Sequence, residues 1–128
     1  ALAIFDNPKF VISPIEMIEE LEITYSYQTI NYFLNSKKPD DELFFIVGAD
    51  AFNGIDTWKT GLKVLDLCKF VVVSRDNKEL KFQHKNVIFL NNLNIPISAT
   101  EIRENIKNKK SIKYFVPEKV EAYLCRTK

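Results

Sequence analysis

The chain has 128 residues, of which 46% are hydrophobic, so it has the length and the apolar content of one ordinary domain with a core. Lysine and arginine number 18 against 17 acidic residues, which excludes a strongly basic nucleic-acid binding stripe and requires any anion site to be local. The longest apolar run, Leu43 to Val47, is too short to cross a bilayer. We therefore expect a soluble cytoplasmic protein without nucleic-acid or membrane partners.

The two cysteines, Cys68 and Cys125, lie outside any C-x-x-C spacing, and apolar residues surround each of them. This pattern predicts two buried thiols in a reducing compartment and argues against a zinc site.

The first third of the chain predicts three short elements. Leu2–Phe5 is typical of the last turn of a helix, and Phe10–Ile12 is a short strand candidate that ends at a Ser-Pro pair. With Ser26 as the N-cap, apolar residues recur at helical spacing up to residue 34, which predicts an amphipathic helix.

Three continuous apolar runs follow, at Leu43–Val47, Phe70–Val73 and Val87–Leu90. Runs without polar alternation are typical of parallel strands that are covered on both faces. Between the first two runs, Leu62, Leu65 and Cys68 form a helical apolar stripe. Buried strands that alternate with helices predict an α/β fold with a Rossmann-like, doubly wound and mostly parallel sheet.

The last third predicts two helices. Ser98 and Glu101 form a capping box, so one helix should begin near Ala99, with Ile102 and Ile106 facing a core. Pro117 is well placed as the first residue of a terminal helix.

Arg103 lies beside the start of the helix near Ala99, where the free N–H groups and the helix dipole suit a phosphate. A simpler interpretation is an ordinary capped helix with a solvated arginine. In doubly wound sheets, ligands bind at the carboxyl ends of the strands, which is where Asp50, Arg75 and Ser98 fall. Neither G-x-G-x-x-G nor G-x-x-x-x-G-K occurs, so the usual glycine-rich phosphate cradles are excluded.

Four motifs in order resemble those of bacterial nicotinate-nucleotide adenylyltransferases, which belong to the nucleotidyltransferase superfamily. Residues 24–30 read T-Y-S-Y-Q-T-I, where that family has S-Y-T-x-x-T-L, and residues 45–50 read F-I-V-G-A-D, with Thr57-Trp58 after them. Residues 70–75 read F-V-V-V-S-R, and residues 97–103 read I-S-A-T-E-I-R. The resemblance extends from Ala1 to the C-terminus, so residues 1–128 are expected to be the C-terminal part of one nucleotidyltransferase-like domain.

The resemblance implies transfer of an adenylyl group from ATP, with Mg²⁺, to nicotinate mononucleotide, giving nicotinate adenine dinucleotide and pyrophosphate. It assigns Tyr25, Ser26, Trp58 and Arg75 to nicotinate mononucleotide, with the Trp58 ring stacked on the pyridine. Without the resemblance, Trp58 could equally be a buried structural residue and Ser26 only an N-cap.

On the ATP side, the resemblance assigns Gly48, Asp50, Ile97, Ser98, Thr100 and Arg103. Arg103 would stabilise charge on the phosphates, which is the main requirement of this kind of transfer. The resemblance implies no residue that binds a metal directly and no covalent nucleophile. His84, the single histidine, lies in a polar loop and receives no catalytic role.

One family motif, G-x-F-x-P-x-H-x-G-H with two histidines that contact the ATP phosphates, has no counterpart in the sequence. We therefore expect the chain to be part of a longer protein, to leave apolar surface and unpaired strand edges exposed, and to need preceding residues for catalysis. The alternatives are a sister enzyme that uses nicotinamide mononucleotide or phosphopantetheine, or a non-catalytic interaction domain of the same fold.

Overall fold

A computed structural model describes residues 7–18, 25–74, 78–91 and 96–126. Contacts divide the chain into two compact units, Pro14–Asn94 and a second made of Ala1–Ser13 with Ile95–Lys128, and each is described by itself. The predicted helical turn at Leu2–Phe5 and the site residue Arg75 lie outside the described residues. The expectation that residues 1–128 form part of a single domain stays a prediction.

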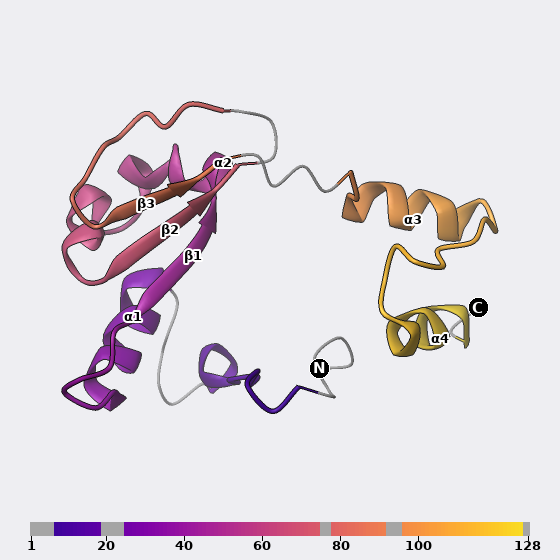
Figure 1. The fold of residues 1–128 in the computed structure, drawn as a ribbon, viewed down its shortest axis with the longest axis horizontal. Helices are drawn as coiled ribbons and strands as arrows, with labels where there is room; N and C mark the ends of the chain where they lie inside the picture. The colour runs from indigo at the N-terminus through magenta and orange to yellow at the C-terminus, as the bar shows by residue number, and fades with distance from the viewer. Residues whose placement is uncertain (1–6, 19–24, 75–77, 92–95, 127–128) are drawn as a thin grey trace. The chain divides into compact units, whose positions relative to one another are not determined.

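The unit Pro14–Asn94 is built on a parallel sheet of three strands in the order β1-β2-β3 (Figure 1). The strands are β1 (Phe44–Gly48), β2 (Lys69–Val73) and β3 (Val87–Leu90). Val72 of β2 lies in register with Val47 on one side and Phe89 on the other. All three strands begin and end within one residue of the predicted runs, so the prediction of a parallel α/β fold is confirmed.

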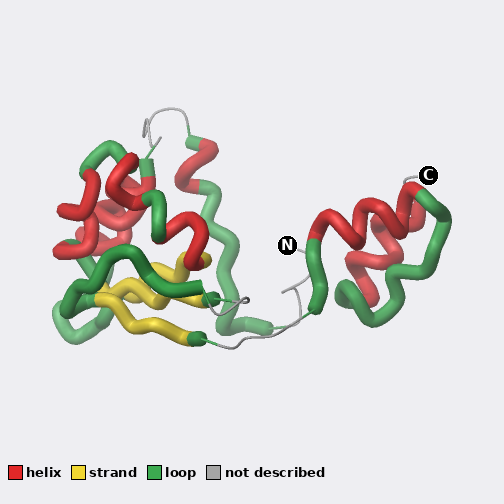
Figure 2. The backbone as a smooth tube through the Cα atoms, turned by 90° about the horizontal axis from the view of Figure 1, so that it is seen from above, coloured by secondary structure: helices red, strands yellow, loops and turns green. Residues whose placement is uncertain are grey.

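Helix α1 (Ser26–Ser36) precedes the sheet, and three short helices connect β1 to β2. These are α2 (Ala49–Phe52) and two 3₁₀ helices, η4 (Ile55–Thr57) and η5 (Gly61–Asp66). The helices that connect β1 to β2 lie to one side of the strands (Figure 2). The apolar stripe predicted an α-helix in this connection, and that helix type is wrong. The segment forms a 3₁₀ helix, whose three-residue period matches the spacing of the stripe.

Val64 and Leu65 are the buried residues of η5, whereas Leu62, which the prediction placed in the stripe, is exposed.

The start of α1 also differs from the prediction by one position: Ser26 is its first helical residue and Tyr25 is its N-cap. The Tyr25 backbone N–H donates to Gln28 Oε1 at 2.9 Å, so a glutamine in the first turn closes this helix end.

The core lies between the sheet and these helices. Its fully buried side chains include Phe52, Ile55 and Val64 from the connecting segment, and Phe70 and Val72 from β2. Phe70 and Val72 alternate with residues that are only partly buried, as the two-residue period of a strand requires.

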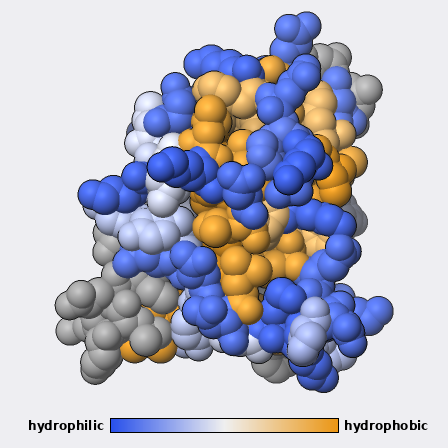
Figure 3. All heavy atoms as spheres, turned by 90° about the vertical axis from the view of Figure 1, so that its left-hand side faces the viewer, coloured by the Kyte–Doolittle hydropathy of each residue, from blue (hydrophilic) through white to orange (hydrophobic). Residues whose placement is uncertain are grey.

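The opposite face of the sheet contradicts the prediction of strands covered on both faces. Within this unit, Ile46 is 71% exposed, and Phe44, Ile88 and Leu90 are exposed as well. On another side of the molecule, the one that lies to the left in Figure 1, Figure 3 also shows hydrophobic surface between hydrophilic side chains. The expectation of exposed apolar surface on the strands is confirmed.

Phe10–Ile12 does not form the predicted strand. All three of its side chains are exposed, and the sheet of the described residues pairs none of them. A strand is stable only with a hydrogen-bonded neighbour, which the apolar run alone did not supply. A single 3₁₀ turn, η2 (Ile15–Met17), follows and buries Ile15.

The second unit contains α3 (Ala99–Lys107) and α4 (Glu118–Arg126). The predicted start of α3 at Ala99 is confirmed, but Ile102 and Ile106 are only half-buried, so they do not face a closed core. Helix α4 begins one residue later than predicted, with the Pro117 carbonyl accepting from the Glu121 N–H at 3.0 Å.

Between these helices Ile112 is buried, and the backbone adopts the left-handed conformation at Lys109 and Tyr114, with φ of 56° and 70°.

Cys68 is buried as predicted, whereas Cys125 is exposed. Cys125 lies about a quarter-turn around α4 from Leu124, which is the half-buried residue beside it. Neither thiol forms a disulfide. Within the described ranges, every helix is too short or too polar to span a membrane.

Candidate functional site

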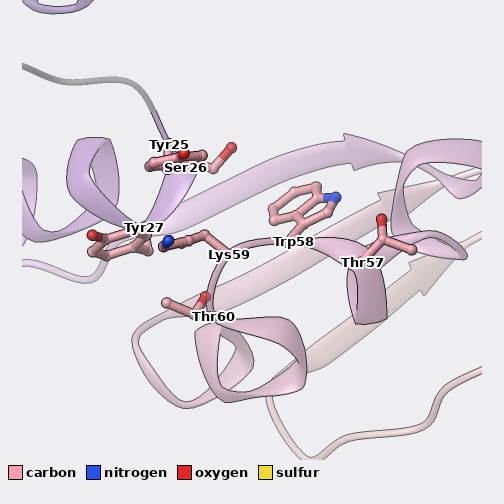
Figure 4. Close-up of a pocket in the computed structure, with 7 residues that line it drawn as sticks. All are labelled: Tyr25, Ser26, Tyr27, Thr57, Trp58, Lys59 and Thr60. Carbon is pink, nitrogen blue, oxygen red and sulfur yellow. The ribbon is translucent and has the colours of Figure 1, made fainter.

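A pocket of about 250 Å³ opens beside the start of α1 in the unit Pro14–Asn94 (Figure 4). Its lining comes from two short segments, the residues that begin α1 and those that follow η4: Tyr25, Ser26, Tyr27, Thr57, Trp58, Lys59 and Thr60. The fold therefore brings together three residues that the sequence assigned to one substrate, Tyr25, Ser26 and Trp58.

Trp58 occupies the first extended position after η4, with φ −68° and ψ 157°. Its ring is half-buried and packs edge-on against Phe45 of β1, with centroids 6.3 Å apart and planes at 78°. The indole thus packs on the sheet and also lines the pocket. The ring is also one of the partly buried residues that pack against the core, as the structural alternative expects.

Tyr25 presents an exposed ring at the helix start, stacked on Tyr27 with centroids 6.2 Å apart and planes at 15°. Lys59 Nζ lies 5.7 Å from the centroid of the Tyr25 ring. Because α1 begins at Ser26, the first turn of this helix adds N–H groups without intrahelical partners at the pocket. Ring surfaces, a cation and helix-start donors all suit a planar anionic ligand.

Gly48 and Asp50 lie where β1 ends and α2 begins. A Cβ placed on Gly48 would meet no atom within 4 Å, so the backbone there is open to a close approach. Asp50 Oδ1 lies 2.5 Å from Lys78 Nζ. This is the carboxyl end of a parallel strand, the usual place for a ligand in such folds.

The remaining predicted residues belong to the second unit and gather at the start of α3. Ser98 Oγ accepts from the Glu101 backbone N–H at 3.1 Å, which confirms the cap. Arg103 Nη2 donates to Thr100 Oγ1 at 3.4 Å, so these two side chains share one face of the first turns. Ile97 directly precedes the cap, and Arg103 is exposed.

Sequence reasoning did not assign several residues of these sites. Lys59 and Tyr27 line the pocket, and their positions next to Trp58 and Ser26 were an available signal. Lys78 pairs with Asp50 from 28 positions away, a contact that only the fold reveals. His84 has structural contacts: its Nε2 lies 3.3 Å from Asp66 Oδ1, and its Nδ1 accepts from the Asn86 N–H.

Over the described ranges, no group of three or more His, Cys, Asp or Glu side chains could hold a metal ion. Mg²⁺ is commonly bound through one or two carboxylates together with ligand phosphates, so it does not require such a group.

The arrangement of parallel strands, with candidate ligand-binding residues at a strand end and at a helix start, agrees with a comparison to known families. The model of the cytidylyltransferase-like family matches residues 3–105. The chain belongs to the cytidylyltransferase-like family.

Relatives of this cytidylyltransferase-like chain include a probable nicotinate-nucleotide adenylyltransferase of Clostridium botulinum (strain Alaska E43 / Type E3), 40% identical over 92% of this chain. Proteins of the same name from Dictyoglomus thermophilum and Thermus thermophilus are 39% and 35% identical over 98% and 96% of the chain. The chain spans 62%, 67% and 65% of the length of these three relatives. The resemblance drawn from the four motifs is thereby confirmed.

Proposed function

We propose that the protein carrying this chain transfers an adenylyl group from ATP to nicotinate mononucleotide. In this reaction an oxygen of the mononucleotide phosphate bonds to the α-phosphorus of ATP, and the bond to the leaving pyrophosphate breaks. The products are nicotinate adenine dinucleotide and pyrophosphate, so the reaction belongs to NAD biosynthesis. The proposal rests on the pocket that brings Tyr25, Ser26 and Trp58 together, in a chain whose relatives include a probable nicotinate-nucleotide adenylyltransferase.

The pocket supports the acceptor half of the proposal. The Trp58 ring offers a flat apolar surface for a pyridine, and its packing on Phe45 limits the rotamer freedom that binding would otherwise cost. Tyr25 and Ser26 offer hydroxyl groups and helix-start N–H donors for a carboxylate. On the proposed assignment Arg75 would also serve the acceptor.

The ATP half of the proposal uses two groups of residues. Gly48 leaves room for the nucleotide and Asp50 accepts from a ribose hydroxyl at the end of β1. Ile97, Ser98, Thr100 and Arg103 would hold adenine and the phosphates at the start of α3. Transfer of this kind depends on positioning and charge stabilisation, so Arg103 acts by neutralising charge that develops on the pyrophosphate.

Mg²⁺ enters the proposed reaction with ATP and neutralises phosphate charge. We also propose that the protein works in the cytoplasm, a location that its two free thiols support. Nucleic acid and membranes are not among the proposed partners.

The proposal is tested by pyrophosphate release from ATP and nicotinate mononucleotide, measured with the full-length natural polypeptide that carries this sequence. Trp58→Ala should raise KM for the mononucleotide about tenfold or more, because the stacking surface is lost. Trp58→Phe keeps a flat ring and should lose only a few-fold. Absence of pyrophosphate release with this acceptor, in a folded wild-type protein, would sink the proposal.

A further inference from the structure

Lys59 is the one formally charged residue among the seven that line the pocket beside α1. Its neighbours there are aromatic or hydroxyl side chains, and its ammonium lies over the Tyr25 ring with Nζ 5.7 Å from the centroid (Figure 4). The ion pairs of Lys69 with Glu42 and of Lys78 with Asp50 lie elsewhere in the described chain, and neither involves Lys59. The positive charge in this pocket is therefore not neutralised by a carboxylate of the described chain.

The Trp58 ring and the Lys59 ammonium lie at the same pocket because the two residues are neighbours in the sequence. Trp58 and Lys59 are consecutive, and both line the same pocket, the ring packed on Phe45 and the ammonium held at Tyr25. A pocket of about 250 Å³ is below the usual range for a whole drug-sized ligand, so it fits one ring with its substituent. A ring stacked on Trp58 would carry its substituent toward the Lys59 ammonium and the start of α1.

We propose that Lys59 selects an acidic pyridine over its amide, by placing its ammonium against the carboxylate of the acceptor. This inference rests on the proposed function and adds a specificity residue to it. A carboxylate gains a charge-assisted contact with Lys59, whereas the neutral amide gains much less, so this side chain adds to the preference for the acid that the helix-start donors at Tyr25 and Ser26 provide.

The acceptor also has a phosphate that the Lys59 ammonium could bind instead of the carboxylate. A comparison of the acid and amide mononucleotides distinguishes these two contacts. Nicotinate and nicotinamide mononucleotides share ribose and phosphate and differ in the carboxylate alone. Loss of a phosphate contact would weaken both ligands equally, while loss of a carboxylate contact would weaken only the acid.

The test uses the full-length natural polypeptide that carries this sequence, in which Trp58, the single tryptophan of residues 1–128, reports on the pocket. Fluorescence titrations give the Kd of each mononucleotide for wild type, Lys59→Met, Lys59→Arg and Lys63→Met. Lys59→Met should weaken nicotinate mononucleotide about tenfold or more, the effect of removing a hydrogen bond to a charged group, and change the amide less than twofold. Lys59→Arg should keep most of the preference.

Lys63→Met is the matched control, since Lys63 is an exposed lysine of η5 outside the pocket and should change neither Kd. The preference of wild type for the acid should also shrink as salt is raised. Equal loss of both mononucleotides in Lys59→Met, or no loss of the acid, overturns the inference, as does failure of wild type to bind either ligand. If the acid binds normally, and this binding depends on Lys59, but no pyrophosphate is released, the proposed function is overturned and the inference about Lys59 stands.

Discussion

The carboxylate of Asp50 and the ammonium of Lys78 form an ion pair, with Oδ1 and Nζ 2.5 Å apart, between residues 28 positions apart in the chain. The Lys78 backbone N–H also donates to Ser74 Oγ, so this lysine is anchored next to the carboxyl end of β2. Both side chains remain well exposed, at 79% for Asp50 and 48% for Lys78, and exposed pairs contribute only about 0–1 kcal/mol to stability. The pair therefore matters for the orientation of Asp50 more than for the free energy of unfolding.

Asp50→Asn should weaken ATP binding about tenfold while changing the free energy of unfolding by less than about 1 kcal/mol. The reason is that an ionised carboxylate accepts a ribose hydroxyl more strongly than an amide does, whereas its exposed pair with Lys78 adds little stability. Isothermal titration of ATP into the full-length polypeptide measures the first quantity, and urea unfolding measures the second.

Lys78→Met serves as the matched control, because it removes the same ion pair and leaves the carboxylate in place. It should reduce ATP affinity less than Asp50→Asn does. If both variants lose affinity to the same extent, the ion pair and not the Asp50 carboxylate is what the nucleotide requires.

Arg103→Ala should lower kcat/KM for ATP by about a hundredfold, as expected when a charge-stabilising donor is removed, with little change in stability. The guanidinium is exposed and its described contact is a 3.4 Å hydrogen bond to Thr100 in the same helix, so its loss costs the fold little. Pyrophosphate release and thermal unfolding of the full-length polypeptide test both halves of this prediction.

Ser98→Ala, unlike Arg103→Ala, should lower the stability of the fold. The hydroxyl caps α3 through the Glu101 N–H, and loss of such a cap costs about 1 kcal/mol. A comparable loss of stability in Arg103→Ala would identify the start of α3 as an ordinary capped helix with a solvated arginine.

The sequence predicted the elements whose signals are local and missed those that depend on distant partners. The run Val87–Leu90 marked β3 to the residue, and Ser98 with Glu101 marked the start of α3. Phe10–Ile12 has the same apolar character as β3, yet the described sheet does not include it, because pairing depends on a neighbour that a run of residues does not reveal.

The same limit applies to the site. Tyr25, Ser26 and Trp58 were grouped by their motifs, and the pocket confirms that they lie together. Lys59 was not singled out, because a lysine in a loop is ordinary until its ammonium is found over a tyrosine ring that lies 34 positions earlier.

Phe70→Ala and Ile46→Thr should differ sharply in their effect on stability, although both replace apolar residues of neighbouring strands. Phe70 is fully buried, so its truncation should cost about 3–5 kcal/mol. Ile46 is 71% exposed, and threonine keeps the β-branch, so the second change should stay within about 0.5 kcal/mol. Urea unfolding of this chain gives both values, and a large loss in Ile46→Thr would mean that this face is covered in solution.

The two thiols should react with an alkylating reagent at very different rates. Cys125 is exposed, whereas burial raises the pKa of the Cys68 thiol, with a backbone hydrogen bond at Phe45 acting in the opposite direction. The thiolate is the reactive form, so at pH 8 one thiol should react rapidly and the other only after denaturant is added. Cys125→Ser should remove the fast phase, and two equal rates in the native chain would contradict the buried position of Cys68.

The raised pKa also sets how stability depends on pH. A thiol with a higher pKa in the folded state contributes stability that is fully present below the pKa of the unfolded thiol, about 8.5. That contribution is lost as pH rises through the folded pKa, because the unfolded chain then releases a proton that the native chain retains. Wild type should therefore lose stability as pH rises above about 8.5, and Cys68→Ala should show a smaller loss over the same range in urea unfolding. An equal loss in both would assign the alkaline dependence to other groups.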